Sequence, residues 1–215
     1  MKRIIIICEG QTEIEFCKDV LAQHFSNKNI FIQTPLIKKS GGGIVPWNNL
    51  KKQIENHLNE PEVYVTTFID YYGIPDNYNY PKWLQSNKIF DKNDRMSFLE
   101  NEMKLDLKNN IRFIPYIQLH EFEGLLFNNI DVFDQHIASN EFNSRNDLVT
   151  IINQYPNPEM INNNRKTAPS KRLQNHIIGY NKIVYGSILA ESIGLVKIRE
   201  KSPRFNKWIE TLESI

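Results

Sequence analysis

The sequence lacks several features that mark specialised classes of protein. Its 215 residues include only two cysteines, Cys8 and Cys17, too few for a disulfide framework or a four-cysteine zinc site. We therefore expect a reduced, cytoplasmic setting with both thiols buried as small apolar side chains. The apolar run at residues 4–8 is far too short for a signal peptide or a membrane span. No membrane partner is expected.

The sequence also lacks an excess of charge of either sign. The formal net charge is +1, so the chain has no global basic field, and any nucleic acid would have to meet a local basic patch. Hydrophobic residues make up 40% of the chain and charged residues 24%, which is ordinary for a globular protein and argues against wholesale disorder. A chain of this length can bury one sizeable core.

What the sequence does contain is an alternation of strand and helix patterns. β-Branched and apolar runs predict strands at residues 3–8, 30–37, 62–70 and 111–119, with helices between them. This order predicts an α/β fold with a mainly parallel four-stranded sheet flanked by helices. We expect residues 1–130 to form this α/β core and residues 131–215 to form a mainly helical C-terminal extension packed on it.

Apolar residues at helical spacing, with capping residues before them, define the predicted helices. Residues 75–94 are rich in Asn, Asp, Tyr and Pro and are predicted to be mostly irregular. The predicted helices are one from Thr12 as N-cap to Phe25, one led by Pro46, one over residues 95–107, and two short ones within 186–213, the second opened by Ser202 and Pro203.

Each of three predicted strands ends in a carboxylate: Glu9 after the first, Asp70 after the third and Glu121 after the fourth. Ligands of parallel sheets bind at the carboxyl ends of the strands, so these side chains are expected to share one site. Gathered carboxylates repel each other, and a hard divalent cation such as Mg²⁺ or Mn²⁺ removes that repulsion. Such a cation supports phosphodiester chemistry by polarising phosphoryl oxygens and generating hydroxide.

Each of these residues also has a plain structural interpretation. Glu9 or Glu13 could simply complement the dipole of the following helix, and Asp70 could only begin a turn. His120 could be a ligand, a general acid or a hydrogen-bonded structural residue. The glycine-rich stretch at residues 40–43 could approach a phosphate or serve as a flexible connector, although it lacks the Gly-Lys-Ser/Thr ending of a P-loop.

Residues 162–182 form a locally basic segment on an otherwise neutral chain. Such a segment could follow a phosphate backbone and make binding salt-dependent, or it could be a solvated basic loop. We expect Lys171 or Lys182 to counter the charge that develops on phosphate. Tyr180 and Tyr185 could stack on bases, although aromatic residues at this spacing more often pack in a core. The basic residues of the segment are Arg165, Lys166, Lys171, Arg172 and Lys182.

Several short motifs, taken in order, resemble the Toprim superfamily and, within it, the domain-of-unknown-function family 4276. They are CEGQTE after the first strand, FIDYYG after the third, HEFEGLLF after the fourth, PSKRL, and the segment from GYNKIVYG to the C-terminus. The resemblance implies a Toprim fold with a catalytic glutamate at Glu9 and the first aspartate of an Asp-x-Asp pair at Asp70. Tyr72 stands where that pair has its second aspartate, so Glu121 or Glu123 would supply the missing metal ligand.

The resemblance also bears on activity and partners. Nucleases of the overcoming-lysogenization-defect group carry a second glutamate just after the first, as Glu13 does here, which favours a nuclease acting on DNA or RNA. Relatives of this kind imply an ATPase partner and a role in defence against phage or mobile elements. Two other classes remain open: a non-catalytic interaction module and an enzyme acting on small phosphates such as nucleotides. Oligomeric state is also open.

Overall fold

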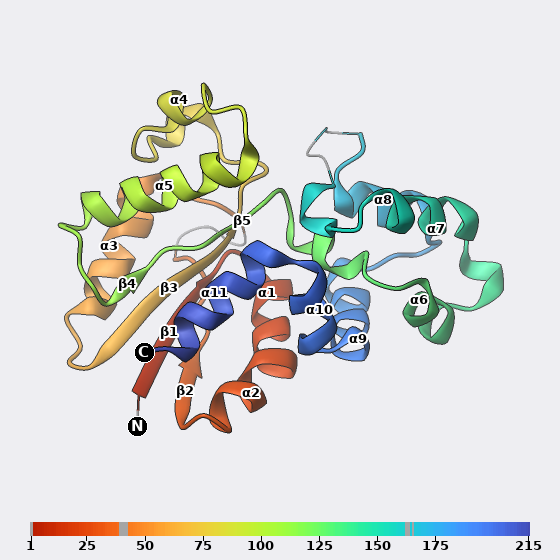
Figure 1. Ribbon diagram of the computed structural model, residues 1–215, viewed down its shortest axis with the longest axis horizontal. Helices are drawn as coiled ribbons and strands as arrows, with labels where there is room; N and C mark the ends of the chain where they lie inside the picture. The colour runs from red at the N-terminus through yellow and green to blue at the C-terminus, as the bar shows by residue number, and fades with distance from the viewer. Residues whose placement is uncertain (1, 39–42, 162–163, 165) are drawn as a thin grey trace.

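The computed structural model describes residues 2–38, 43–161, 164 and 166–215. Over these residues the chain forms a five-stranded parallel sheet in the order β2-β1-β3-β4, with β5 pairing the end of β3 (Figure 1). The α/β prediction is therefore confirmed, with all ladders parallel. The strands are β1 (Lys2–Cys8), β2 (Ile30–Gln33), β3 (Val63–Asp70), β4 (Phe113–Ile114) and β5 (Ile117–Gln118).

Strand β1 lies between two hydrophobic clusters, as its uninterrupted apolar run predicts. Ile4 and Ile6 belong to one cluster, whereas Ile5 and Ile7 belong to the other, because successive side chains of a strand point to opposite faces. Helices pack on both faces of the sheet (Figure 1).

One face of the sheet is covered by α1, α2 and α11 and the other by α3 and α5, while α6, α7 and α8 form a lobe to one side (Figure 1). The helices are α1 (Gln11–Phe16), α2 (Ala22–Ser26), α3 (Trp47–Leu58), α4 (Trp83–Ser86), α5 (Lys92–Asp106), α6 (Ile130–His136), α7 (Arg145–Gln154), α8 (Pro169–His176), α9 (Lys182–Ile193), α10 (Leu195–Lys201) and α11 (Pro203–Glu213). A π-helical turn, η1 (Cys17–Leu21), joins α1 to α2, and the 3₁₀ turns are η2 (Asp76–Tyr78), η3 (Phe122–Leu126), η4 (Ser139–Glu141) and η5 (Pro158–Met160).

The predicted fourth strand is broken into two short pieces, β4 and β5. Pro115 lies between them and has no N–H to donate to a ladder. The Thr67 hydroxyl takes the place of the ladder here, accepting from the Tyr116 N–H at 3.0 Å and donating to the Tyr116 carbonyl at 2.8 Å. The prediction placed this strand correctly within residues 111–119, but it was wrong in expecting one continuous strand.

Two helix predictions are also corrected. The first helix is capped by Gly10 and not by Thr12, which is buried inside the helix, because Glu13 accepts the Gly10 N–H at 2.9 Å. Residues 182–213, all of them described, form three helices instead of two. Gly194 ends α9 with a φ of +77°, a conformation that favours glycine, and α10 starts at the next residue.

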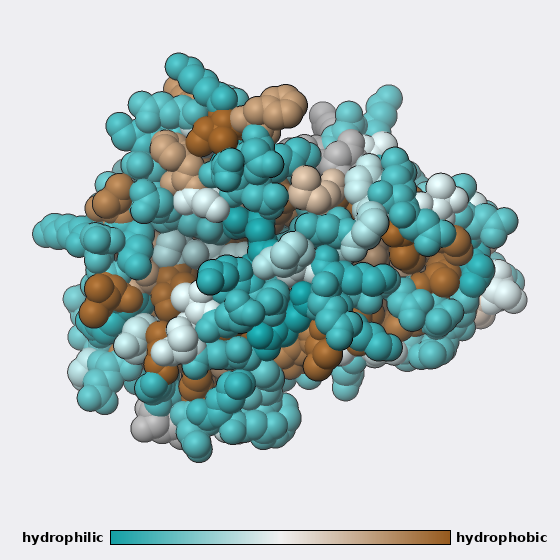
Figure 2. Space-filling model, viewed as in Figure 1, coloured by the Kyte–Doolittle hydropathy of each residue, from teal (hydrophilic) through white to brown (hydrophobic). Residues whose placement is uncertain are grey.

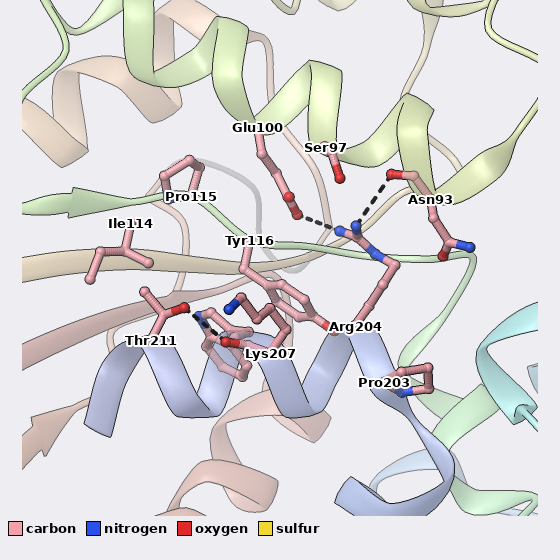
Figure 3. A pocket seen from close by; sticks show the side chains of 11 residues that line it. Asn93, Ser97, Glu100, Ile114, Pro115, Tyr116, Pro203, Arg204, Lys207 and Thr211 are labelled. Atoms are coloured by element: carbon pink, nitrogen blue, oxygen red, sulfur yellow. Dashed lines mark hydrogen bonds and ion pairs between the residues drawn. The ribbon is translucent and has the colours of Figure 1, made fainter. Parts of the chain in front are cut away.

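The outer edge of β4 and β5 is covered by side chains and not by another strand. Glu100 on α5 accepts the Ile117 N–H at 2.9 Å, and Arg204 on α11 pairs with Glu100 at 2.6 Å. Figure 3 shows Arg204 reaching from α11 toward Glu100. Both residues line a pocket of about 390 Å³ together with Tyr116. The ion pair thus blocks an edge that would otherwise invite pairing with another chain.

The surface is mostly hydrophilic on the face seen in Figure 2, where apolar side chains form separate patches. Large apolar residues that are exposed include Leu84 and Phe90 near α4, and Ile183, Val184 and Val196 on α9 and α10. Within the described residues, no helix is both long enough and apolar enough to cross a membrane.

Candidate functional site at the strand tips

Glu9 and Asp70 meet at the carboxyl ends of the neighbouring strands β1 and β3. The last residue pair between the two strands is Cys8 with Phe68, and Glu9 follows directly. The Glu9 N–H still donates to the Phe68 carbonyl at 3.1 Å. Its carboxylate atom Oε2 then accepts the N–H of Asp70 at 2.9 Å. Asp70 Oδ1 in turn accepts the N–H of Phe122, the first residue of η3, at 2.9 Å. The two acids are thus held together by backbone donors.

The start of α1 brings a further carboxylate to the same place. Glu13 lies one helical turn after Gly10, and its Oε2 accepts the Gly10 N–H, which turns the side chain back toward the tip of β1. The side chain is 2% exposed. Glu13 therefore both caps the helix and adds negative charge beside Glu9.

Glu123 and Lys182 form the other side of the site. Glu123 lies in η3 and is completely buried, and Lys182 Nζ lies 2.9 Å from its Oε1 in an ion pair. Neither carboxylate oxygen accepts a well-oriented hydrogen bond from the described residues. Lys182 is the first residue of α9, where the helix dipole disfavours a cation. The nearby acids offset that cost.

Close packing of α9 on α1 positions Lys182. Gly186 lies one turn after Lys182, and a Cβ atom there would come within 2.9 Å of Thr12 Cγ2 on α1. Only glycine lets the two helices approach this closely. Sequence reasoning singled out Lys182 but gave no role to Gly186, which had no visible partner in the sequence.

These groups act on each other electrostatically. Burial, opposed by the Asp70 N–H and reinforced by the charge of Glu13, raises the pKa of Glu9 to about 7. Burial and then the charge of Glu9 raise the pKa of Asp70 well above its ordinary value. Burial disfavours the charged form of Lys182, but Glu123, Asp70 and Glu13 outweigh it and raise the Lys182 pKa. Burial also raises the pKa of Glu123, against the effect of Lys182.

Glu121 has a structural role that Glu9 and Asp70 do not have, because it caps an α-helix. Its Oε2 accepts the N–H of Ser170 at 2.8 Å in the first turn of α8, so it caps that helix from outside. Its charge still raises the pKa of Glu123. Glu121 therefore lies beside the site with one oxygen occupied by the fold.

His120 is buried, next to the strand tips. Its carbonyl accepts the Tyr72 N–H at 2.9 Å, which places Tyr72 directly beside it. The ring atom Nε2 lies 2.9 Å from Lys92 Nζ at the start of α5, and the buried Nδ1 has no partner among the described residues. Burial, followed by the charges of Lys92 and Arg95, lowers the His120 pKa to about 3, so the ring stays neutral.

The basic side chains of residues 162–182 that the structure describes lie in different environments. Lys171 is exposed and donates to Gln174 on its own helix at 2.9 Å, whereas Arg172 donates to the Thr167 carbonyl at 2.7 Å and lies over the Tyr155 ring. Tyr180 and Tyr185 stack on each other and pack against the main hydrophobic cluster. Arg165 lies outside the described residues. Lys182, also named from the sequence, forms an ion pair with Glu123 in η3.

The glycine-rich stretch falls mostly outside the described residues, which resume at Gly43. The Gly43 N–H donates to the Glu9 carbonyl at 3.1 Å, with a φ of +108°. This loop therefore returns to the tip of β1. Both cysteines are free and buried, as predicted.

The donor set fits a hard cation by its chemistry, because it consists of carboxylate oxygens. Glu123 Oε1 pairs with Lys182, and the other buried oxygen, Oε2, has no hydrogen-bond partner among the described residues. Among the described residues, however, no three His, Cys, Asp or Glu side chains are already placed to hold one ion together. Lys182 provides the positive charge near these acids in their present arrangement.

Sequence reasoning missed several residues of this region. Lys92 was assigned to irregular chain, although Asp91 caps α5 by accepting the Asn93 and Asp94 N–H groups, and an Asp before a helical pattern is a recognisable start signal. Tyr180 was predicted either to stack on bases or to pack in a core, and its hydroxyl was given no role. That buried hydroxyl has no partner among the described residues, and burial, reinforced by the charge of Glu123, raises its pKa.

Comparison with known proteins gives a family and no activity. No curated protein and no solved structure matches the chain significantly. The model of a family described as a domain of unknown function, DUF4276, matches residues 8–213, which include all the strand-tip acids and Lys182. The chain belongs to the DUF4276 family.

Proposed function

We propose that this protein is a metal-dependent nuclease with a Toprim-like fold that hydrolyses phosphodiester bonds in DNA or RNA. The observation that carries the proposal is the convergence of Glu9 and Asp70 at adjacent strand tips. Burial and the charge of Glu13 raise the pKa of Glu9, and burial and the charge of Glu9 raise the pKa of Asp70. Carboxylates with raised pKa values, one of them buried and the other half-buried, beside a cation are typical of functional sites. Structural packing alone would not require them.

Each residue has a proposed role. Glu9 and Asp70 would bind Mg²⁺ or Mn²⁺, and Glu121 or Glu123 would complete the coordination or act as base. When bound, the ion would polarise a phosphoryl oxygen and lower the pKa of a water molecule. Lys182 would counter the charge that grows on phosphate, with Lys171 and Arg172 contacting the backbone farther out. Glu13 would hold the start of α1 and the tip of β1 in place.

The Toprim resemblance extends the proposal to partners. An ATPase partner and a role in defence against phage or mobile elements are implied by that resemblance. We infer a cytoplasmic location from the free, buried thiols of Cys8 and Cys17.

A non-catalytic interaction module is the second candidate. Two observations favour it: Tyr72 replaces the second aspartate of the Toprim pattern, and no three ligating side chains already converge among the described residues. In that case the acids would bind a basic partner surface, and chelators would not weaken the binding.

The first experiment is calorimetric titration of Mg²⁺ and Mn²⁺ into wild type, Glu9→Gln, Asp70→Asn and the control Glu55→Gln, whose carboxylate is exposed on α3. Plasmid and tRNA cleavage is measured on the same samples. We expect saturable binding and metal-dependent cutting in wild type and Glu55→Gln and the loss of both in the site variants. Absence of metal binding to wild type would refute the nuclease and leave the interaction module.

A further inference from the structure

A lysine outside the acidic site is held in place by a neutral ring. Lys92 is the first residue of α5, and its Nζ lies 2.9 Å from His120 Nε2. An ammonium group has only donors, so Lys92 donates and His120 Nε2 accepts, which places the ring hydrogen on Nδ1. Lys92 is therefore oriented by one hydrogen bond and keeps its other two N–H donors.

His120 is built firmly into the fold. Its side chain is 1% exposed, and its backbone has a φ of +68°, which a residue other than glycine adopts only at a cost. Such strained residues cluster at binding and catalytic sites, where the surrounding structure holds them. The bond from the Tyr72 N–H to the His120 carbonyl fixes this conformation.

Two cations here lack an acidic partner. Among the described residues no carboxylate forms an ion pair with Lys92 or with Arg95, one turn farther along α5. Arg95 donates instead to the Ile89 carbonyl, at 3.0 and 2.7 Å, and to the Tyr71 hydroxyl at 3.0 Å. Burial and the charge of Arg95 disfavour the charged form of Lys92. An anion from outside the chain would offset this effect, because a nearby opposite charge favours the charged form of lysine.

The position of Lys92 relative to the acids is informative. His120 follows β5, the strand next to Asp70 on β3, and the N-terminal end of α5 lies beside β5 (Figure 1). Lys182 is close enough to shift the pKa values of Glu9 and Asp70, whereas Arg95 is the charged group that shifts the pKa of Lys92. Lys92 thus lies beside the acidic site through His120, the neighbour of Glu121, and forms no ion pair with a described strand-tip acid.

A purely structural role for Lys92 explains less. A neutral donor would satisfy His120 without bringing an uncompensated charge to this edge of the sheet. The pocket between α5 and α11 differs in this respect, because Arg204 there pairs with Glu100, which also covers the sheet edge.

We propose that Lys92, seated on His120, binds a backbone phosphate adjacent to the phosphate that enters the acidic site. The proposal rests on the proposed nuclease function and adds a second phosphate contact on the substrate strand, a contact that a mononucleotide cannot make because it has no second phosphodiester to reach Lys92. The shared ligand chemistry is the phosphodiester backbone, and the test separates DNA from RNA.

The test uses the full chain and fluorescein-labelled 12-nucleotide single strands of DNA and RNA with the same sequence. Binding is measured by anisotropy over a series of KCl concentrations, with Ca²⁺ in place of Mg²⁺. In Lys92→Gln the amide can still donate to His120, but the charge is gone. We expect its affinity to fall about fivefold to tenfold and its log K against log salt slope to flatten by about 0.7, the value for one phosphate contact on a single strand.

Two variants serve as controls. Lys104→Gln removes the same charge at the other end of α5 and should keep the wild-type slope, while Lys92→Arg should recover most of the affinity. AMP should bind wild type and Lys92→Gln equally. Matching thermal unfolding curves establish that the variants are folded.

The two proposals fail in different ways. The Lys92 contact is overturned if Lys92→Gln keeps the wild-type slope on both strands, or if wild type binds neither strand. If the slope changes as expected but wild type does not cut either strand in Mg²⁺ or Mn²⁺, the phosphate contact stands and the nuclease function fails.

Discussion

At the scale of single residues, the acids at the strand tips are held by backbone donors and not by cations alone. Glu9 accepts the Asp70 N–H, Asp70 accepts the Phe122 N–H and Glu13 accepts the Gly10 N–H. Each carboxylate thus has a fixed orientation before any ligand arrives. The arrangement also lowers the stability of the folded protein when these groups are ionised, because burial and repulsion disfavour the charged forms of Glu9 and Asp70.

This cost predicts a particular pH dependence for Glu9. Its pKa is about 7 in the folded protein against 4.5 for an ordinary glutamate, so the unfolded chain loses this proton first as the pH rises. Stability contributed by protonated Glu9 is present below pH 4.5 and is lost between pH 4.5 and about 7. Without divalent metal, we expect the free energy of unfolding of Glu9→Gln to rise relative to wild type by on the order of 3 kcal/mol across this window.

Urea unfolding at several pH values measures this difference. Glu55→Gln, which removes an exposed carboxylate, should follow the wild-type curve. Parallel curves for wild type and Glu9→Gln would show that the Glu9 carboxylate ionises normally in the folded protein.

At the scale of elements, the site depends on how closely α9 lies against α1. α9 contributes Lys182, and the contact between Gly186 and Thr12 sets its distance from the tip of β1. The preceding Asn181 caps α9 by accepting the Ile183 and Val184 N–H groups. A local change at Gly186 should therefore affect both stability and the Glu123–Lys182 ion pair.

Gly186→Ala tests this contact. The new Cβ would lie 2.9 Å from Thr12 Cγ2, and we expect a loss of about 1–3 kcal/mol despite the better helix propensity of alanine. Thr12→Ser removes Cγ2, so the double variant should recover most of the loss. Chemical unfolding of the four proteins gives the coupling energy. Additive effects would place the strain elsewhere.

At the scale of the whole molecule, the C-terminal residues complete the core of the sheet. Phe205 and Trp208 on α11 belong to the same hydrophobic cluster as Ile4, Ile6 and Phe68 on β1 and β3. The Trp208 ring stacks on Tyr116 with centroids 4.4 Å apart, and its indole N–H donates to Thr66 Oγ1 at 2.9 Å. Helix α11 thus covers one face of the sheet.

We expect residues 1–130 alone not to fold cooperatively, because this cluster would be exposed on the sheet. Full-length protein should show one urea transition by circular dichroism and tryptophan fluorescence together, and the fragment should show none. A sharp transition of the isolated fragment would establish residues 1–130 as an independent core and residues 131–215 as an added extension.

Much of the fold could be predicted from the sequence because the signals are local. The uninterrupted apolar run of β1 predicts a strand buried on both faces, and the strand-helix alternation predicts parallel pairing. The break at Pro115 and the end of α9 at Gly194 also have local causes that a stricter reading would have found. The cap at Gly10 depends on the Glu13 side chain folding back, which the sequence pattern does not distinguish from a Thr12 cap.

The sequence by itself determined which acids lie at the strand tips, because parallel strands end at one edge of the sheet. Only the tertiary structure decided which of them act together. In the structure Glu123 forms an ion pair with Lys182 of α9, and one oxygen of Glu121 accepts a hydrogen bond from α8. Lys92 is hydrogen-bonded to His120. These choices depend on contacts between residues that are distant in sequence. The physical reason is that helix packing and burial set those contacts and their electrostatics. Neither produces a pattern in the neighbouring sequence from which the contacts could be predicted.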